Sequence, residues 1–202
     1  MRYHLNRLGR SAFTLVELLV VMGIIAALAG LLFPVAGGVQ RQVKKVKTRA
    51  LFASLKMGVD MFYSEYQRMP KLTGAGSGGD VAFKSDDAMG REMVSALTGD
   101  VDDDTAKRLN PKTLSFCEFT EKQLQDSDTR GFGGYLIDGF GNTFYMVLDY
   151  DYDGKIDRNK FGELPPRLAP QGDIRSNFAA WSRGSAKDVG SMTPADIVAS
   201  WK

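Results

Sequence analysis

Residues 9–34 read GRSAFTLVELLVVMGIIAALAGLLFP, and this stretch decides how the rest of the chain is organised. Within it, residues 13–33 carry a single charge, that of Glu17. As a helix they would extend about 31 Å, close to the hydrocarbon thickness of a bilayer, which is about 30 Å. A secretory signal that is removed has a shorter apolar core, usually about 7–15 residues, with a small-residue cleavage site behind it. We therefore expect residues 13–33 to form a retained helix that crosses a membrane once.

Charge is distributed unevenly along the 202 residues. Residues 1–12 are basic, residues 34–70 carry seven basic and two acidic side chains, and residues 71–202 are acidic overall. The net charge of +2 and the ordinary composition give no reason to expect a nucleic-acid partner. The chain has one cysteine, Cys117, and one histidine, His4. These counts exclude an intrachain disulfide, a cysteine-based zinc site and a serine-histidine-aspartate triad, so we do not expect an enzyme.

Glu17 is the residue of the apolar stretch that most needs an explanation. A carboxylate inside a membrane helix is costly and calls for a partner or a function. One interpretation is that Glu17 reaches the membrane interface, because it lies near the helix end. The other is that a positive group meets it inside the membrane. Cleavage between Ala12 and Phe13 would create such a group, the new α-amine, which a neighbouring subunit could also supply.

Gly9-Arg10-Ser11-Ala12 followed by Phe13-Thr14-Leu15-Val16-Glu17-Leu18 resembles the cleavage and methylation signal of type IV prepilins and pseudopilins. Counted from Phe13, Glu17 is the fifth residue and Pro34 the twenty-second, the positions of the family's glutamate and helix-kinking proline. Ala12 stands where the family most often has glycine. The resemblance implies that prepilin peptidase cuts after Ala12, that the new amine is methylated and that Glu17 directs assembly. It also implies a single-pass protein of the inner membrane with its C-terminal head in the periplasm.

The helix should continue beyond the apolar stretch. Small and apolar side chains recur at steps of three and four residues, at Val39, Val43, Val46, Ala50, Ala53, Met57 and Met61. This spacing predicts one amphipathic helix from residue 13 to about residue 68, ended by Pro70. Pro34 and the glycines at 37 and 38 predict a kink or melted turn at 34–38. The expected segments are a leader (1–12), a transmembrane and assembly helix (13–33), a helical stalk (34–70) and a globular head (71–202).

The head is expected to contain a helix over 85–98 and a β-hairpin over 133–148 that turns at residues 139–142. Residues 138–142, DGFGN, are similar to the Asp-Pro-Trp-Gly-Asn turn of major pseudopilins of type II secretion systems. Residues 181–184 resemble the last strand and following loop of those proteins, and residues 195–201 resemble their terminal segment. The expected fold class is α+β, with a long N-terminal helix packed on a small antiparallel sheet.

Residues 149–157, DYDYDGKID, carry acids at relative positions 1, 3, 5 and 9 and a glycine at 6, as at the start of an EF-hand loop. The candidate calcium ligands are the side chains of Asp149, Asp151, Asp153 and Asp157 and the main-chain carbonyl of Lys155. Position 12 is Lys160 instead of glutamate, and no helix pattern precedes the loop. We therefore expect a calcium-binding loop that is not an EF-hand, with a solvated acidic turn as the alternative. The resemblance points to a second location in the C-terminal loop, at Asp188 and Asp196.

As function, the resemblance implies a structural subunit of a pseudopilus filament for type II protein secretion. The implied partners are further copies of the chain, prepilin peptidase, an inner-membrane assembly platform, minor pseudopilins and membrane lipid. A type IV pilus subunit for adhesion, motility or DNA uptake is the main alternative, although residues 181–201 and the lack of a cysteine-closed C-terminal loop favour secretion. Two weaker candidates are a membrane-anchored enzyme and a calcium-binding module with a simple anchor.

Overall fold

The computed structural model describes residues 13–76, 78–100, 108–126 and 134–201, with only the backbone described for residues 31–37. The chain divides into two compact units, one ending at Gln40 and one running from Arg41 to the C-terminus. The elements are α1 (Leu15–Tyr66), β1 (Val81–Lys84), α2 (Ala88–Thr98), β2 (Leu124–Gln125), β3 (Tyr135–Leu136), β4 (Tyr145–Leu148), the short 3-10 helix η1 (Arg158–Phe161), β5 (Phe178–Ser182) and β6 (Val198–Ala199). Both the long N-terminal helix and the α+β class are confirmed.

In the first unit, α1 is exposed along nearly all of its described side chains. The helix includes residues 34–38, so the melted turn expected there is not present. Within the described ranges, no helix has an apolar stretch long enough to cross a membrane. The membrane span expected at residues 13–33 is therefore not confirmed, and the leader, residues 1–12, lies outside the described residues.

In the second unit, α1 packs into the core through a face that the sequence pattern did not single out. The buried residues of this face are Thr48, Leu51, Phe52, Leu55, Val59 and Phe62. The stripe predicted from spacing, from Val39 to Met61, is exposed instead; Met57, for example, is 60% exposed. Both stripes have helical spacing, and the larger aliphatic and aromatic side chains occupy the buried one because they remove more apolar area from water.

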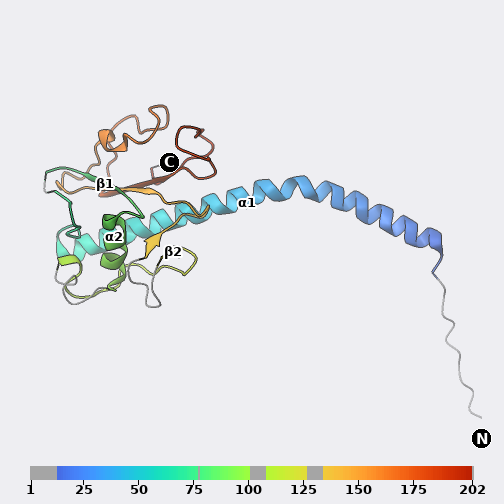
Figure 1. Ribbon diagram of the computed structural model, residues 1–202, viewed down its shortest axis with the longest axis horizontal. Coiled ribbons are helices and arrows are strands. Elements are labelled where there is room, and N and C mark those ends of the chain that lie inside the picture. The colour runs from blue at the N-terminus through green and yellow to red at the C-terminus, as the bar shows by residue number, and fades with distance from the viewer. Residues whose placement is uncertain (1–12, 77, 101–107, 127–133, 202) are drawn as a thin grey trace, which may run out of the picture. The chain divides into compact units, whose positions relative to one another are not determined.

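The main sheet has the strand order β1-β4-β5-β6, and every neighbouring pair is antiparallel. Figure 1 shows this sheet and α2 gathered around the second half of α1. The hairpin expected over 133–148 is wrong: β3 pairs with β2, whereas β4 pairs with β1 and β5. The physical reason is that the turn at 138–142 packs against α1 instead of joining two paired strands. The helix expected over 85–98 is confirmed as α2.

Both faces of the sheet are buried, because side chains alternate between them along each strand. On one face, Met146 and Leu148 of β4 pack with α1 and α2. On the other face, Val147 of β4 and Trp181 of β5 pack against the loops that follow η1 and against the C-terminal segment. This double burial explains why every residue of β5, FAAWS, is buried.

Candidate functional site

The N-terminal end of α1 is held by a reciprocal set of hydrogen bonds. The amide and the hydroxyl of Thr14 donate to Oε2 of Glu17, at 2.9 Å and 2.8 Å. The amide of Glu17 donates in return to Oγ1 of Thr14, at 3.2 Å. This is a capping box, in which a threonine before the helix and a glutamate three residues later satisfy amides that have no partner within the helix.

The capping box gives Glu17 a second role, as an acceptor that stabilises the start of its own helix. The Thr-x-x-Glu spacing at residues 14–17 is the signal that reveals it. Phe13 directly precedes the box and is 73% exposed. Ala12, on the other side of the expected cleavage point, lies outside the described residues. The structure thus places the capping box directly after the position where a new N-terminus would form.

The turn at 138–142 is closed by Asp138 and joined to the loop after β5. Oδ1 of Asp138 accepts the amides of Phe140 and Asn142, both at 2.8 Å. Its other carboxylate oxygen accepts the hydroxyl of Ser182. The side chain of Asn142 donates to the carbonyl of Gly184 at 2.8 Å. Two of the three segments that resemble major pseudopilins therefore contact each other directly.

The same turn and the terminal segment both contact α1. The amide of Gly139 donates to the Thr48 hydroxyl at 3.0 Å. A Cβ at position 139 would lie 2.3 Å from the carbonyl oxygen of Lys44, so only glycine allows this approach. Arg41 pairs with Asp196, and Lys45 donates to the carbonyl of Ala195. Two basic residues at the start of the stalk are thus engaged within the chain.

Asp196 is fully engaged by protein donors. The hydroxyl and amide of Thr193 bind one oxygen, at 2.5 Å and 3.0 Å, and the Ser185 hydroxyl binds the other at 2.8 Å. These hydrogen bonds, led by the Thr193 hydroxyl, together with the nearby Arg41 lower the pKa of Asp196 to about 2. Asp188 instead accepts the Ser191 amide at 2.8 Å. Among the described residues, Asp188 and Asp196 do not belong to a common cluster of acidic side chains that could hold a metal ion.

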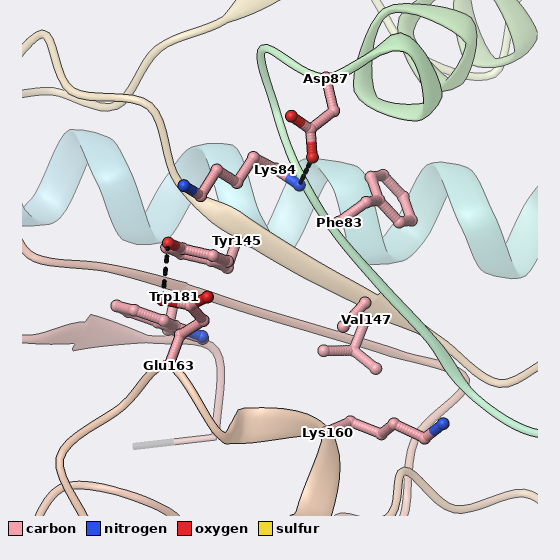
Figure 2. Close-up of a pocket in the computed structure, with 9 residues that line it drawn as sticks. Phe83, Lys84, Asp87, Tyr145, Val147, Lys160, Glu163 and Trp181 are labelled. Atoms are coloured by element: carbon pink, nitrogen blue, oxygen red, sulfur yellow. Dashed lines mark hydrogen bonds between the residues drawn. The ribbon is translucent and has the colours of Figure 1, made fainter.

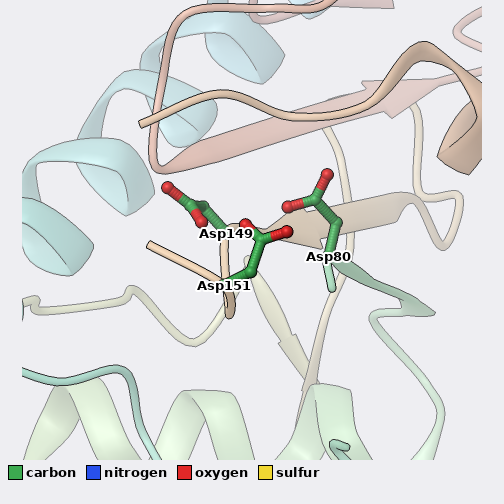
Figure 3. Close-up of side chains that lie close together, drawn as sticks. All are labelled: Asp80, Asp149 and Asp151. Atoms are coloured by element: carbon green, nitrogen blue, oxygen red, sulfur yellow. The ribbon is translucent and has the colours of Figure 1, made fainter. Parts of the chain in front are cut away.

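Three carboxylates meet where β1 begins and β4 ends. Asp80, Asp149 and Asp151 place one oxygen each within 4.8 Å of the others. Figure 3 shows the carboxylates of Asp80 and Asp151 facing each other. Asp80 and Asp149 are buried, at 6% and 1% exposure, whereas Asp151 is exposed. The structure thus brings two of the predicted ligands, Asp149 and Asp151, close together and places beside them Asp80, which the sequence pattern did not indicate.

Burial raises the pKa of Asp80, and repulsion from Asp151 and Asp149 raises it further. The Asp157 amide, which donates to Oδ2 of Asp80 at 2.6 Å, and the charge of Lys160 act in the opposite direction. Burial also raises the pKa of Asp149, although the amides of Gly154 and Tyr152 favour its charged form. The cluster therefore concentrates negative charge in a place where water stabilises it poorly.

The remaining predicted ligands of the loop bind other groups. Oδ1 of Asp153 accepts the Lys155 amide at 2.8 Å. Oδ1 of Asp157 accepts the Asn159 amide at 2.9 Å and so caps η1. Among the described residues, the group of three carboxylates does not include Asp153 or Asp157. That these two side chains and the Lys155 carbonyl bind calcium stays a prediction.

A separate open cavity of about 250 Å³ lies over the sheet (Figure 2). Its lining includes the stacked rings of Tyr145 and Trp181, whose centroids are 4.3 Å apart. The ammonium of Lys84 lies 5.1 Å from the Tyr145 ring centroid, and the Tyr145 hydroxyl donates to Glu163 at 3.4 Å. The lining residues are Ala82, Phe83, Lys84, Asp87, Tyr145, Val147, Lys160, Glu163 and Trp181, a set without a serine, cysteine or histidine.

Comparison with known protein families identifies the N-terminal segment. Residues 7–33 match the family profile "Prokaryotic N-terminal methylation motif". No curated protein and no solved structure gives a significant match. The motif is a type IV prepilin-like signal, and it suggests an N-terminus anchored in a membrane. It implies that the chain is a type IV pilin-like subunit processed by prepilin peptidase.

Proposed function

We propose that the chain is a structural, non-enzymatic subunit of a pseudopilus filament for type II protein secretion. The observation that carries this proposal is the methylation motif at residues 7–33, with Glu17 at the start of α1. In this proposal prepilin peptidase removes residues 1–12 and methylates the α-amine of Phe13. The segment 13–33 anchors the subunit in the inner membrane, and the head lies in the periplasm.

Assembly would use Glu17 as an acceptor for the amine of a neighbouring subunit. The capping box holds the carboxylate at the exposed end of α1, and only one of its oxygens, Oε2, takes part. Among the described residues, the other oxygen accepts no hydrogen bond, and in this proposal it receives the cation from outside the helix. Pairing with a terminal ammonium would neutralise two charges that are costly in lipid, so the gain would come only when subunits meet.

The stalk offers a second surface to neighbouring subunits. The exposed apolar stripe of α1 contains Val43, Val46, Ala50, Ala53, Met57 and Met61. A continuous apolar face that the head leaves uncovered is a typical site of protein association. We propose that adjacent copies of the chain cover it in the filament, and that the assembly platform and minor pseudopilins are the further partners.

Secretion is preferred to a pilus because of the segments around the 138–142 turn. Asp138, Asn142 and the loop after β5 resemble major pseudopilins in sequence, and they form one hydrogen-bonded group. The single cysteine of the head, Cys117, is free and buried, so no disulfide within the chain joins the C-terminal loop to the head. A type IV pilus subunit for adhesion, motility or DNA uptake remains the alternative, since the methylation motif is common to both classes.

N-terminal sequencing of the membrane-extracted protein tests the processing step. Co-expression with prepilin peptidase should give a chain that begins with methylated Phe13, whereas cells without the peptidase should yield one beginning at Met1. A chain that still begins at Met1 in assembled filaments would overturn the proposal. Deletion of the gene should then abolish export of secreted proteins and leave surface pili unchanged. Loss of pili with normal export would support the alternative.

A further inference from the structure

Asp80 and Asp149 occupy facing positions at the end of a strand pair. β1 begins at Val81 and β4 ends at Leu148, and these two residues are partners in the antiparallel register. The residues just outside the pair, Asp80 and Asp149, are therefore the next ones across from each other. Like charges directly opposite on antiparallel strands destabilise a sheet. Asp151 follows two residues after Asp149 and adds a third carboxylate to the same place.

The charge of this cluster is not matched by an ion pair in the described part of the protein. None of the three carboxylates lies within 4.0 Å of the charged nitrogen of a described basic residue. Oδ1 of Asp80 is buried and has no hydrogen-bond partner there. A buried carboxylate oxygen without a donor or a cation costs free energy, and such unpartnered oxygens are rare in native proteins. This orphaned oxygen belongs to a side chain that is only 6% exposed.

We propose that Asp80, Asp149 and Asp151 bind one calcium ion. Three carboxylates supply only oxygen ligands, which suit a hard divalent cation. Calcium accepts six to eight oxygens in flexible geometry, so water and main-chain carbonyls can complete its shell. Magnesium keeps a strict octahedron and releases its waters reluctantly, which fits poorly with two buried carboxylates. This assignment does not depend on the filament function.

Hydrogen bonds within the loop hold the Asp149 carboxylate in place without an ion. The Tyr152 amide donates to Oδ1 of Asp149 at 2.6 Å, and the Gly154 amide donates to Oδ2 at 2.9 Å. These bonds fix the direction of the carboxylate and leave each oxygen a free lone pair. The site therefore differs from an EF-hand loop, because a residue from another strand, Asp80, takes part, and Asp153 and Asp157 bind main-chain amides.

Calcium in this position would tie the loop to β1. The Asp157 amide already donates to Oδ2 of Asp80, so the two ends of the loop, residues 149 and 157, both meet this one side chain. Ligand binding to the folded state alone stabilises that state. The expected consequence is a head whose thermal stability depends on calcium.

The mature full-length protein in detergent provides the test. Unfolding is followed by tryptophan fluorescence, because both tryptophans, Trp181 and Trp201, lie in the second unit. After treatment with EDTA, calcium chloride at about 100 times its Kd should raise Tm by roughly 5 °C or more. Magnesium chloride at the same concentration should have a much smaller effect. No rise with calcium, or an equal rise with magnesium, would overturn the assignment.

Variants separate this site from the loop alone. Asp80→Asn keeps an oxygen for the Asp157 amide but removes a ligand charge, so calcium binding by isothermal titration should weaken at least tenfold. Its Tm in EDTA should equal or exceed that of the unmodified protein, which also shows that it folds. Asp151→Asn, at an exposed position, should weaken binding similarly. Asp153→Asn is the matched control and should bind normally; a loss equal to that of Asp80→Asn would refute the three-residue site.

Discussion

At the scale of single residues, Glu17 combines a helix cap with a charge whose partner, in the proposed filament, lies outside the helix. Its carboxylate accepts two donors from Thr14, and Thr14 accepts the Glu17 amide in return. A capping box needs only an acceptor at the glutamate position, and glutamine also serves there. Pairing with an ammonium in lipid needs the negative charge. The two roles can therefore be separated by substitution.

Glu17→Gln should leave α1 capped and the protein in the membrane fraction, yet abolish filament formation, because the amide carries no charge. Thr14→Ala is the matched control: it removes the capping hydroxyl, costs about 1 kcal/mol of helix stability and keeps the charge. Filaments sheared from cells and quantified by immunoblot provide the measurement. Normal filaments with Glu17→Gln would show that the charge is not required for assembly.

Asp196 should make the head sensitive to acid. Its pKa in the folded protein is about 2, below the ordinary value of 3.8, so its contribution to stability is complete above pH 4. That contribution is lost as the pH falls from about 4 to about 2, because the folded state then gains a proton less readily than the unfolded state. Urea unfolding followed by tryptophan fluorescence should show a midpoint that decreases over this range. Asp196→Asn should have a lower midpoint at pH 6 and a weaker decrease; an unchanged profile would contradict this role.

At the scale of elements, α1 has two apolar stripes, one buried in the core of the second unit and one exposed. The buried stripe meets the sheet and α2, whereas the exposed stripe has no cover among the described residues of the second unit. Helical spacing alone describes both stripes equally well. The distinction therefore rests on which side chains the sheet contacts.

Leu55→Ala and Met57→Ala should separate the two stripes. Leu55 is fully buried, so its truncation should lower the free energy of unfolding by about 2–5 kcal/mol. Met57 is 60% exposed, and its truncation should change that free energy by no more than about 0.5 kcal/mol. Under the proposed filament function, Met57→Asp should reduce filament yield without changing Tm. Equal destabilisation by the two alanine variants would show that the exposed stripe is covered within the subunit.

At the scale of the whole molecule, the second unit contains both hydrophobic clusters of the described chain. One cluster lies between α1, α2 and the sheet, and the other lies beneath the loops on the opposite face of the sheet. The helical residues 41–66 belong to this unit. Removal of these residues would expose the apolar side chains of the sheet and α2 that pack against α1.

A fragment that begins at Arg41 should therefore fold by itself. We expect cooperative thermal unfolding, with a free energy of unfolding in the usual range of about 5–15 kcal/mol. A fragment that begins at Pro70 is the matched control, and it should be unfolded or molten because it lacks Leu51, Leu55 and Phe62. Circular dichroism and tryptophan fluorescence report both transitions. A cooperative transition in the shorter fragment would show that the head folds without the helix.

Features that depend on neighbouring residues were predictable from the order of amino acids. The apolar run, the helical spacing from Val39 to Met61 and the proline at position 70 predict one long helix, and the resemblance of residues 9–18 to a prepilin signal implies a processed N-terminus. The helix is confirmed as α1, and the signal as a methylation motif. The 85–98 helix was equally predictable, because capping, spacing and turn chemistry act over a few residues.

Strand pairing, the buried face of α1 and the grouping of the three acids all depend on long-range packing and follow from the folded chain alone. The 133–148 hairpin failed because β4 finds its partners in β1 and β5, far away along the chain. Asp80 could not be assigned from sequence, since 69 positions separate it from Asp149 and its neighbours give no metal-binding pattern. Strand register brought the two carboxylates together. Register depends on side-chain packing across the whole sheet, which no local pattern encodes.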